Sequence, residues 1–94
     1  MNVAVVGIGP VGIVTASGLA RAGHRVHATD RDASRVDALR EGRTPIVEPG
    51  LAARVAESVA SGRLVAEDSI AAAVSHATVL LLCVGTPALP SGPV

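Results

Sequence analysis

The sequence predicts an α/β protein with a partial, doubly wound parallel sheet of four strands. Short β-branched segments alternate with stretches of helical periodicity along the 94 residues. The first strand runs directly into a turn with three glycines, and the last is apolar on both faces, as in sheets covered by helices. Right-handed crossovers give the expected sheet order 3-2-1-4. The expected strands are residues 2–6, 25–29, 64–66 and 78–84, and the expected helices are residues 10–22, 33–40, 51–61 and a short one ending at residue 74.

Residues at the ends of the first two helices support these bounds. Pro10 has the fixed φ that suits the first helical position, and Gly23 is a good C-terminal stop. The second strand ends at Asp30, and Asp32 is the expected N-cap of the second helix. The apolar residues at helical spacing are Val11, Val14, Gly18, Leu19 and Ala22 in the first helix, and Val36 and Leu39 are the expected inward residues of the second.

The second half of the chain begins with a loop bracketed by prolines, residues 44–50. A third helix follows it, and Asp68 or Ser69 caps the short helix that precedes the last strand. The last strand breaks at residues 85–87, and the tail at residues 87–94 has the composition of a loop. The residues expected on one face of the third helix are Leu51, Val55 and Val59.

Composition excludes several classes of protein. Eight arginines balance eight acidic residues, and this zero net charge gives no long-range field for nucleic acid or an anionic membrane. Residues 1–20 carry no charge, but glycines interrupt the apolar stretch, which is too short to span a bilayer and lacks the basic start of a signal peptide. A single cysteine, Cys83, fits a reducing compartment, so a cytoplasmic location is expected. Phe, Tyr and Trp are absent, so Ala, Val, Leu and Ile must build the core.

The spacing G-x-G-x-x-G between a strand and a helix, with an acidic residue after the next strand, is the dinucleotide-binding fingerprint of a Rossmann-type fold. Gly7 permits the tight turn, Gly9 lets the backbone approach a pyrophosphate, and Gly12 lets the helix pack close to the sheet. The N–H groups of Val11 and Gly12 are the expected phosphate donors, because Pro10 has none. A plain strand-to-helix turn is the alternative. The predicted cofactor-binding segment is Gly7, Ile8, Gly9, Pro10, Val11 and Gly12.

Asp30 is the acidic residue of this fingerprint, eighteen residues after Gly12. A carboxylate there accepts hydrogen bonds from the adenosine ribose hydroxyls and repels a 2′-phosphate, which favours NAD over NADP. Arg31 keeps NADP as an alternative cofactor, because an arginine at this place accommodates the 2′-phosphate. Arg35 opposes the dipole at the start of its helix, so it either contacts the cofactor or is an ordinary surface arginine. For Asp30 the alternative is a solvated loop aspartate.

Thr86 follows the fourth strand at the edge of the sheet where ligands of this fold bind, and Gly85 shapes the loop there. An ordinary turn threonine is the alternative. Cys83 lies within an apolar strand with no cationic neighbour to activate it, so it is not expected to be a nucleophile. The three histidines, His27 among them, lack the spacing of metal ligands, and we expect them at the surface or at strand ends. We therefore predict no catalytic residue and no metal site in the chain.

Four segments narrow the kind of nucleotide-binding protein. Residues 44–51 read T-P-I-V-E-P-G-L, residues 61–64 read S-G-R-L and residues 83–87 read C-V-G-T-P. Together with G-H-R-V at residues 23–26, they resemble the N-terminal region of the UDP-glucose/GDP-mannose dehydrogenase family. The resemblance implies NAD as the cofactor and a four-electron oxidation of the C6 alcohol of a nucleotide sugar to a carboxylate. The positions that match the family's cofactor contacts are Val11, Asp30, Arg35 and Thr86.

The chain departs from the family in two respects. The family commonly has tyrosine in place of Pro10, and its catalytic cysteine, its lysine and its sugar-nucleotide-binding domains lie beyond Val94. Cys83 does not match that cysteine, and Glu48 lies in a loop near the family's active site without an assigned role. We therefore expect residues 1–94 to be an incomplete N-terminal NAD-binding domain that does not turn over substrate alone, from a protein that forms a homo-oligomer when intact.

The expected function is the NAD-binding part of a nucleotide-sugar 6-dehydrogenase. UDP-glucose is the preferred substrate and GDP-mannose the second, since the discriminating residues are missing from the chain. A non-catalytic nucleotide-binding module is an alternative, which the unpaired edge of the apolar fourth strand opposes. Another NAD-dependent enzyme, such as a hydroxyacyl or phosphogluconate dehydrogenase, is opposed by the loop at residues 45–51.

Overall fold

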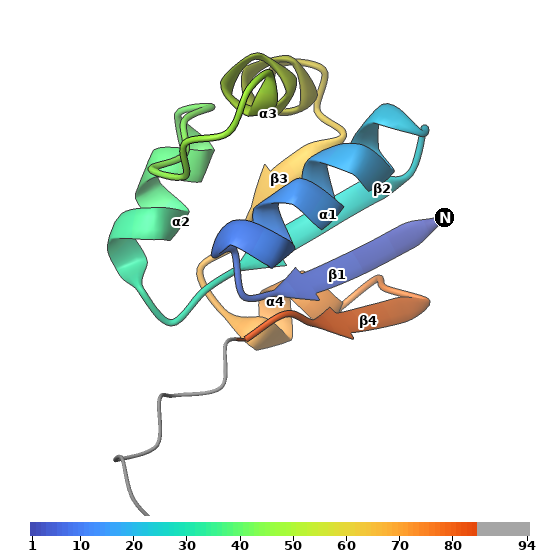
Figure 1. Ribbon diagram of the computed structural model, residues 1–94. Helices are drawn as coiled ribbons and strands as arrows, with labels where there is room; N and C mark the ends of the chain where they lie inside the picture. Colours follow the sequence, from blue (N-terminus) through green and yellow to red (C-terminus); the bar gives the residue numbers. More distant parts are fainter. Residues whose placement is uncertain (85–94) are drawn as a thin grey trace, which may run out of the picture.

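A computed structural model describes residues 1–84 of the chain (Figure 1). Four parallel strands form one sheet in the order β3-β2-β1-β4, which confirms the expected fold and topology. Within the described residues, no helix is both long enough and apolar enough to cross a membrane. The strands are β1 (Asn2–Val6), β2 (Arg25–Thr29), β3 (Leu64–Ala66) and β4 (Val79–Leu82). The helices are α1 (Pro10–Arg21), α2 (Ala33–Arg40), α3 (Leu51–Ala60) and α4 (Ile70–Val74).

Most of these bounds agree with the expected ones, and the differences have local causes. Helices α1 and α3 end one residue early, where Gly23 and Gly62 take positive φ angles of 105° and 78° soon after the last helical turn. Ser69, not Asp68, is the N-cap of α4, because its hydroxyl accepts a hydrogen bond from the Ala72 N–H at 3.0 Å. Strand β4 is shorter than expected, because its pairing with β1 extends over only four residues.

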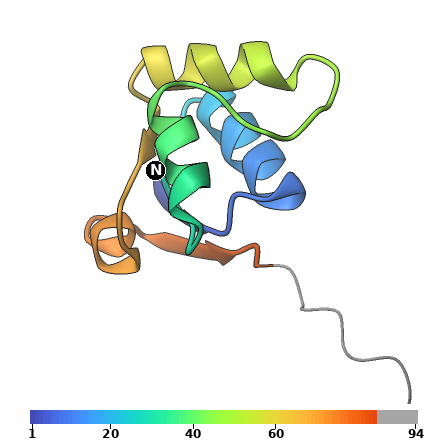
Figure 2. The same ribbon diagram turned by 90° about the vertical axis from the view of Figure 1, so that its left-hand side faces the viewer.

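Helices cover both faces of the sheet. Figures 1 and 2 show α1, α2 and α3 over one face, with α4 on the other side, where it packs against β1 and β2. The larger part of the core lies between the sheet and α1, α2 and α3. On the opposite face, Ala73 of α4 and Ala4 of β1 are both buried. The main core is built from Val, Ile, Leu and Ala alone, as the absence of aromatic residues requires: Val3, Val5, Ile8, Ile13, Ala16, Ala20, Val26, Ala28, Leu39, Leu51, Val55 and Leu64.

Helix α1 buries only part of the face that the apolar spacing marked, because Val14 and Leu19 pack against the core but the other three residues do not. Val11 is 69 % exposed, and Gly18 and Ala22 are also exposed. The cause is the approach of Gly12 to Gly7, where an added Cβ would lie only 1.6 Å from the Gly7 carbonyl oxygen. This contact turns the Gly12 side of the helix toward the sheet. The buried residues are Gly12, Ile13, Ala16, Ser17 and Ala20.

Strand β4 lies at one edge of the sheet with its apolar side chains largely uncovered. Leu80 is 47 % exposed and Leu82 is 68 % exposed, whereas Leu81 packs against the core. One edge of β4 pairs with β1, and no other strand among residues 1–84 pairs with its second edge. An uncovered apolar edge of this kind favours association with another chain or segment.

Candidate functional site

The turn between β1 and α1 is packed so tightly that its first glycine cannot be replaced. Gly7 has a φ of 104°, and a Cβ at this position would lie 2.7 Å from the carbonyl carbon and oxygen of Cys83. The Gly7 N–H donates to the Thr29 carbonyl oxygen at 2.8 Å. The turn is therefore held between the carboxyl ends of β2 and β4.

The N-terminus of α1 presents backbone donors just after this turn. Gly9 is the N-cap and provides no side-chain hydrogen bond, and Pro10 occupies the first turn. The first intrahelical bond runs from the Ile13 N–H to the Gly9 carbonyl oxygen at 2.9 Å. The N–H groups of Val11 and Gly12 therefore have no partner within the helix. Together with the positive end of the helix dipole, they suit a phosphate group.

Asp30 is the first residue after β2, and its carboxylate points back to the glycine turn. Its Oδ2 accepts a hydrogen bond from the Ile8 N–H at 2.8 Å, and its Oδ1 accepts one from the Asp32 N–H at 2.8 Å. The side chain is only 6 % exposed. Burial raises the pKa of Asp30, but the two N–H donors and Arg35 outweigh it and hold that pKa below its ordinary value. Asp30 is therefore ionised at neutral pH.

Ile8 takes a structural place in the site. Its side chain is 2 % exposed and belongs to the core. Its N–H is engaged by Asp30, so it is not one of the open donors beside the turn. Ile8 thus connects the glycine turn to the acidic residue, a contact that the spacing of the motif does not specify.

Arg35 brings a cation from α2 to the edge of the glycine turn. Its Nη1 lies 3.4 Å from Asp30 Oδ2, and its Nε lies 3.9 Å from Asp32 Oδ2. A Cβ added to Gly9 would lie 3.4 Å from the same Nη1. The guanidinium, 38 % exposed, therefore borders the backbone of the turn instead of extending into solvent.

A cleft of about 670 Å³ opens beside the turn, Asp30 and Arg35. This volume lies within the range of small-molecule binding sites. Arg31, the residue that keeps NADP as an alternative cofactor, also lines the cleft. One wall of the cleft was not expected from the sequence, and it is formed by Asp68, Ser69 and Ile70 after β3. The available signal was their position, because the carboxyl ends of neighbouring parallel strands share one edge of the sheet.

The structure bears differently on the predictions for Gly85 and Thr86, for Cys83 and for His27. Gly85 and Thr86 lie outside the described residues, so their contact with a cofactor stays a prediction. Cys83 lines the cleft next to the glycine turn. The prediction for His27 is wrong, because it lies within β2 with its side chain 15 % exposed and its Nδ1 2.8 Å from Glu67 Oε2. His27 pairs with Val65 in the parallel register, which places Glu67 within reach on the same face of the sheet. Among residues 1–84 no three potential metal ligands come together.

Comparison with known proteins identifies the family. The family model described as "UDP-glucose/GDP-mannose dehydrogenase family, NAD binding domain" matches residues 1–92. The chain belongs to this family. Its cofactor is accordingly NAD, and the cleft of the dehydrogenase domain fits that molecule: Val11 at the N-terminus of α1 lines it, and so does Gly9, where an added Cβ would take up space.

Relatives of this dehydrogenase domain include enzymes named for two substrates. The chain is 42 % identical over 87 residues to a UDP-glucose 6-dehydrogenase of Rhizobium meliloti, covering 93 % of the chain and 20 % of the relative. It is 38 % identical over 92 residues to a GDP-mannose 6-dehydrogenase of Pseudomonas putida, covering 98 % of the chain and 21 % of the relative. The chain thus spans about a fifth of the length of these curated relatives.

A solved structure supports the fold of the dehydrogenase domain. The crystal structure of a ternary complex of GDP-mannose dehydrogenase from Pseudomonas aeruginosa matches with a TM-score of 0.93 and 36 % sequence identity. The match covers 99 % of this chain and 21 % of that chain. The parallel sheet and its helices therefore correspond to part of a much longer dehydrogenase chain.

Proposed function

We propose that this chain holds the NAD of a nucleotide-sugar 6-dehydrogenase through the cleft beside its glycine turn. The observation that carries this proposal is the convergence of the α1 N-terminus and the ionised Asp30 carboxylate on one cleft, tied by the 2.8 Å bond from the Ile8 N–H. Positive backbone donors suit the pyrophosphate, and a buried carboxylate suits the ribose hydroxyls. Both requirements of the adenosine diphosphate half are thereby met side by side.

Each of the chain's own groups has a distinct part in this binding. The N–H groups of Val11 and Gly12 donate to the pyrophosphate oxygens. Asp30 accepts hydrogen bonds from the adenosine ribose, for which its two oxygens retain free lone pairs beside the N–H groups they already bind. Arg35 borders the phosphate turn and adds positive charge there. NAD, when bound, supplies the hydride acceptor of the reaction.

Asp30 also provides the preference for NAD over NADP. A 2′-phosphate on the adenosine ribose would face its carboxylate, whose low pKa keeps the negative charge in place at neutral pH. Arg35 already lies near that carboxylate, so its charge is shared with Asp30. Arg31 lines the cleft and is the residue through which NADP would bind after removal of Asp30.

We propose UDP-glucose as the sugar substrate of the whole protein, oxidised at C6 to the carboxylate while two NAD are reduced in turn. The 42 % identity to the Rhizobium meliloti UDP-glucose 6-dehydrogenase supports this choice. GDP-mannose is the second candidate, and the 0.93 TM-score to the Pseudomonas aeruginosa GDP-mannose dehydrogenase supports it. The 94-residue chain by itself is proposed to bind NAD without oxidising either sugar, and the whole protein to be a homo-oligomer.

Calorimetric titration of the chain with NAD and with NADP tests the cofactor proposal. We expect saturable binding of NAD and weaker binding of NADP, and the reverse order would contradict the role of Asp30. Incubation of the whole protein with UDP-glucose or GDP-mannose and NAD, followed by detection of NADH, then tests the substrate. NADH formation with GDP-mannose alone would replace UDP-glucose by the second candidate.

A further inference from the structure

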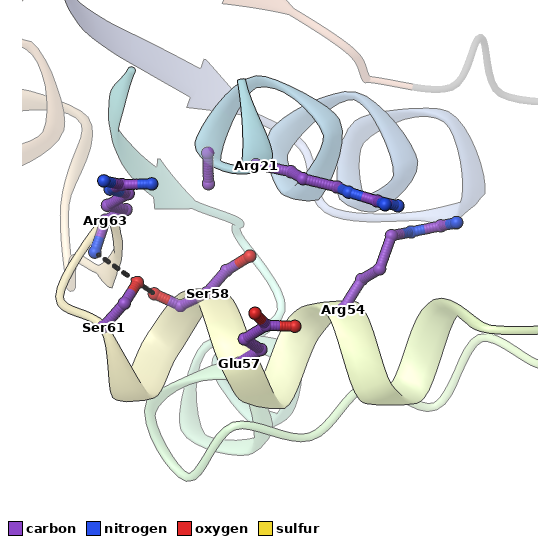
Figure 3. Close-up of a pocket in the computed structure, with 7 residues that line it drawn as sticks. Arg21, Arg54, Glu57, Ser58, Ser61 and Arg63 are labelled. Carbon is purple, nitrogen blue, oxygen red and sulfur yellow. Dashed lines mark hydrogen bonds between the residues drawn. The ribbon is translucent and has the colours of Figure 1, made fainter. Parts of the chain in front are cut away.

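A second hollow lies at the opposite end of α1 from the glycine turn. Its volume is about 100 Å³, and α1, α3 and the residue before β3 line it (Figure 3). The twelve residues of α1 span about 18 Å along the helix axis, which separates this hollow from the cofactor cleft. Nothing in the proposed binding of NAD uses its lining residues.

Three arginines without a carboxylate partner line this hollow. Within the described part of the chain, every ion pair of an arginine lies on or beside α2, and none includes Arg21, Arg54 or Arg63. All three line the hollow. In Figure 3 the side chains of Arg21 and Arg54 extend toward the same side of the view from α1 and α3, whereas that of Arg63 lies on the other side of Ser58. Like charges arranged in this way repel one another, and an anion between them would remove the repulsion.

Ser58 adds an uncharged donor between the arginines. The residue is only 7 % exposed, and its hydroxyl points into the hollow in Figure 3. Its carbonyl oxygen accepts hydrogen bonds from the Ser61 hydroxyl at 3.0 Å and the Arg63 N–H at 3.1 Å. Its hydroxyl forms no hydrogen bond with another of the residues that the structure describes, and so remains open to a ligand. The lining carries one carboxylate, that of Glu57, against three guanidinium groups.

We propose that this hollow binds a small tetrahedral oxyanion, either inorganic phosphate or the phosphate group of a small ester. Guanidinium groups bind such oxygens through two parallel N–H bonds, and a hydroxyl completes the set of donors. With about 100 Å³, the hollow takes a phosphate group, whereas the cofactor cleft of about 670 Å³ takes a dinucleotide. The site is thus distinct from the NAD site in place and in ligand size.

Titration of the chain with sodium phosphate at constant ionic strength, followed by amide NMR, tests the site. We expect saturable shifts at the Ser58 and Ser61 amides that are resolved from any shifts at the glycine turn. Combined replacement Arg21→Gln and Arg54→Gln should weaken binding at least about tenfold, whereas Arg25→Gln, an exposed arginine outside the hollow, should leave it within about twofold. A parallel titration with β-glycerophosphate separates the two ligand sources, because an ester-binding site responds to both compounds.

Glu57→Gln provides a test that loss of folding cannot imitate. Removal of the single carboxylate of the lining should increase the affinity for phosphate, because a repulsive charge is lost. The proposal is overturned if the Ser58 amide of the unmodified chain does not respond to phosphate. It is equally overturned if the double arginine variant responds like the unmodified chain, or if Glu57→Gln leaves the affinity unchanged.

Discussion

The N–H of Ile8 donates to the carboxylate of Asp30 at 2.8 Å, across 22 positions of the chain. This bond joins the glycine turn after β1 to the first residue after β2, so the two halves of the cofactor site are held at a fixed separation. Arg35 reinforces the arrangement from α2, at 3.4 Å from the same carboxylate oxygen. The acidic residue of the fingerprint therefore has a structural part as well as its proposed part in binding the ribose.

Replacement of Asp30 should weaken NAD binding more than replacement of Asp37, an aspartate on the following helix α2 that lies outside the cleft. For Asp30→Ala we expect a loss of about 1.5–3 kcal/mol, because a charged hydrogen-bonding partner is removed. Asp37→Ala removes a carboxylate that is 72 % exposed on α2 and outside the cleft, so it should leave the affinity unchanged. Calorimetry on both variants provides the comparison, and equal affinities would remove Asp30 from the site. Relative affinity for NADP should rise only in Asp30→Ala.

Two glycines of α1 should respond to alanine in opposite directions. Gly12→Ala should destabilise the fold by about 1–3 kcal/mol or prevent folding, because the new Cβ would collide with the Gly7 carbonyl oxygen. Gly18→Ala should raise the free energy of unfolding by about 0.4–1 kcal/mol, because no atom lies within 4 Å of its added Cβ and the unfolded chain loses freedom. Urea unfolding followed by far-UV circular dichroism measures both. A stable Gly12→Ala variant would contradict the tight approach of α1 to the turn.

Acid should destabilise the chain through Asp30. Its pKa in the folded state lies below the ordinary value of 3.8, so its contribution to stability is complete above that value. The contribution is lost as the pH falls from about 4 through the lower folded pKa, where the carboxylate takes up a proton. Urea midpoints measured from neutral pH to strongly acidic pH should fall more steeply for the unmodified chain than for Asp30→Asn. Parallel curves for the two proteins would show that Asp30 does not contribute.

The N-cap of α2 offers a prediction on stability alone. Asp32 accepts the Ser34 N–H at 3.0 Å, so Asp32→Ala should lower the stability of the chain. Asp32→Ser retains a capping oxygen and should stay close to the unmodified chain in stability. Thermal or urea unfolding distinguishes the two variants. If both lose the same stability, the charge of Asp32 beside Arg35 matters more than its cap.

The uncovered edge at β4 should make the isolated chain associate. Leu82 is 68 % exposed at this edge, and Leu82→Lys should shift the sedimentation velocity profile toward monomer. Val47→Lys is the matched control, because Val47 is 99 % exposed in the loop before α3. A chain that is monomeric at high concentration before any substitution would contradict association through β4.

The order of the elements could be predicted because its signals are local. Pro10, Asp32 and the glycines after α1 and α3 mark helix ends through their own backbone preferences. The inward face of α1 was predicted only in part: Gly12 was expected against the sheet, but the burial of Ile13 and Ala16 in place of Val11 depends on how closely Gly12 approaches Gly7. That approach depends on three-dimensional packing.

The candidate site likewise has parts that local patterns predict and parts that depend on the three-dimensional fold. The glycine turn and Asp30 were accessible from spacing, because one motif contains both. The wall at Ser69 and Ile70 was not, since it depends on the position of β3 beside β2. The pairing of His27 with Glu67 likewise joins residues 40 positions apart, through a register that no local pattern specifies.

A core without Phe, Tyr or Trp leaves the chain nearly transparent in the near ultraviolet. Emission from a reduced nicotinamide ring would thus be recorded without a protein background and without energy transfer from indole. Any change in its brightness or polarisation on mixing would report the immediate surroundings of that ring. In the near ultraviolet, the absorption and emission of the complex would therefore come from the dinucleotide and not from the protein.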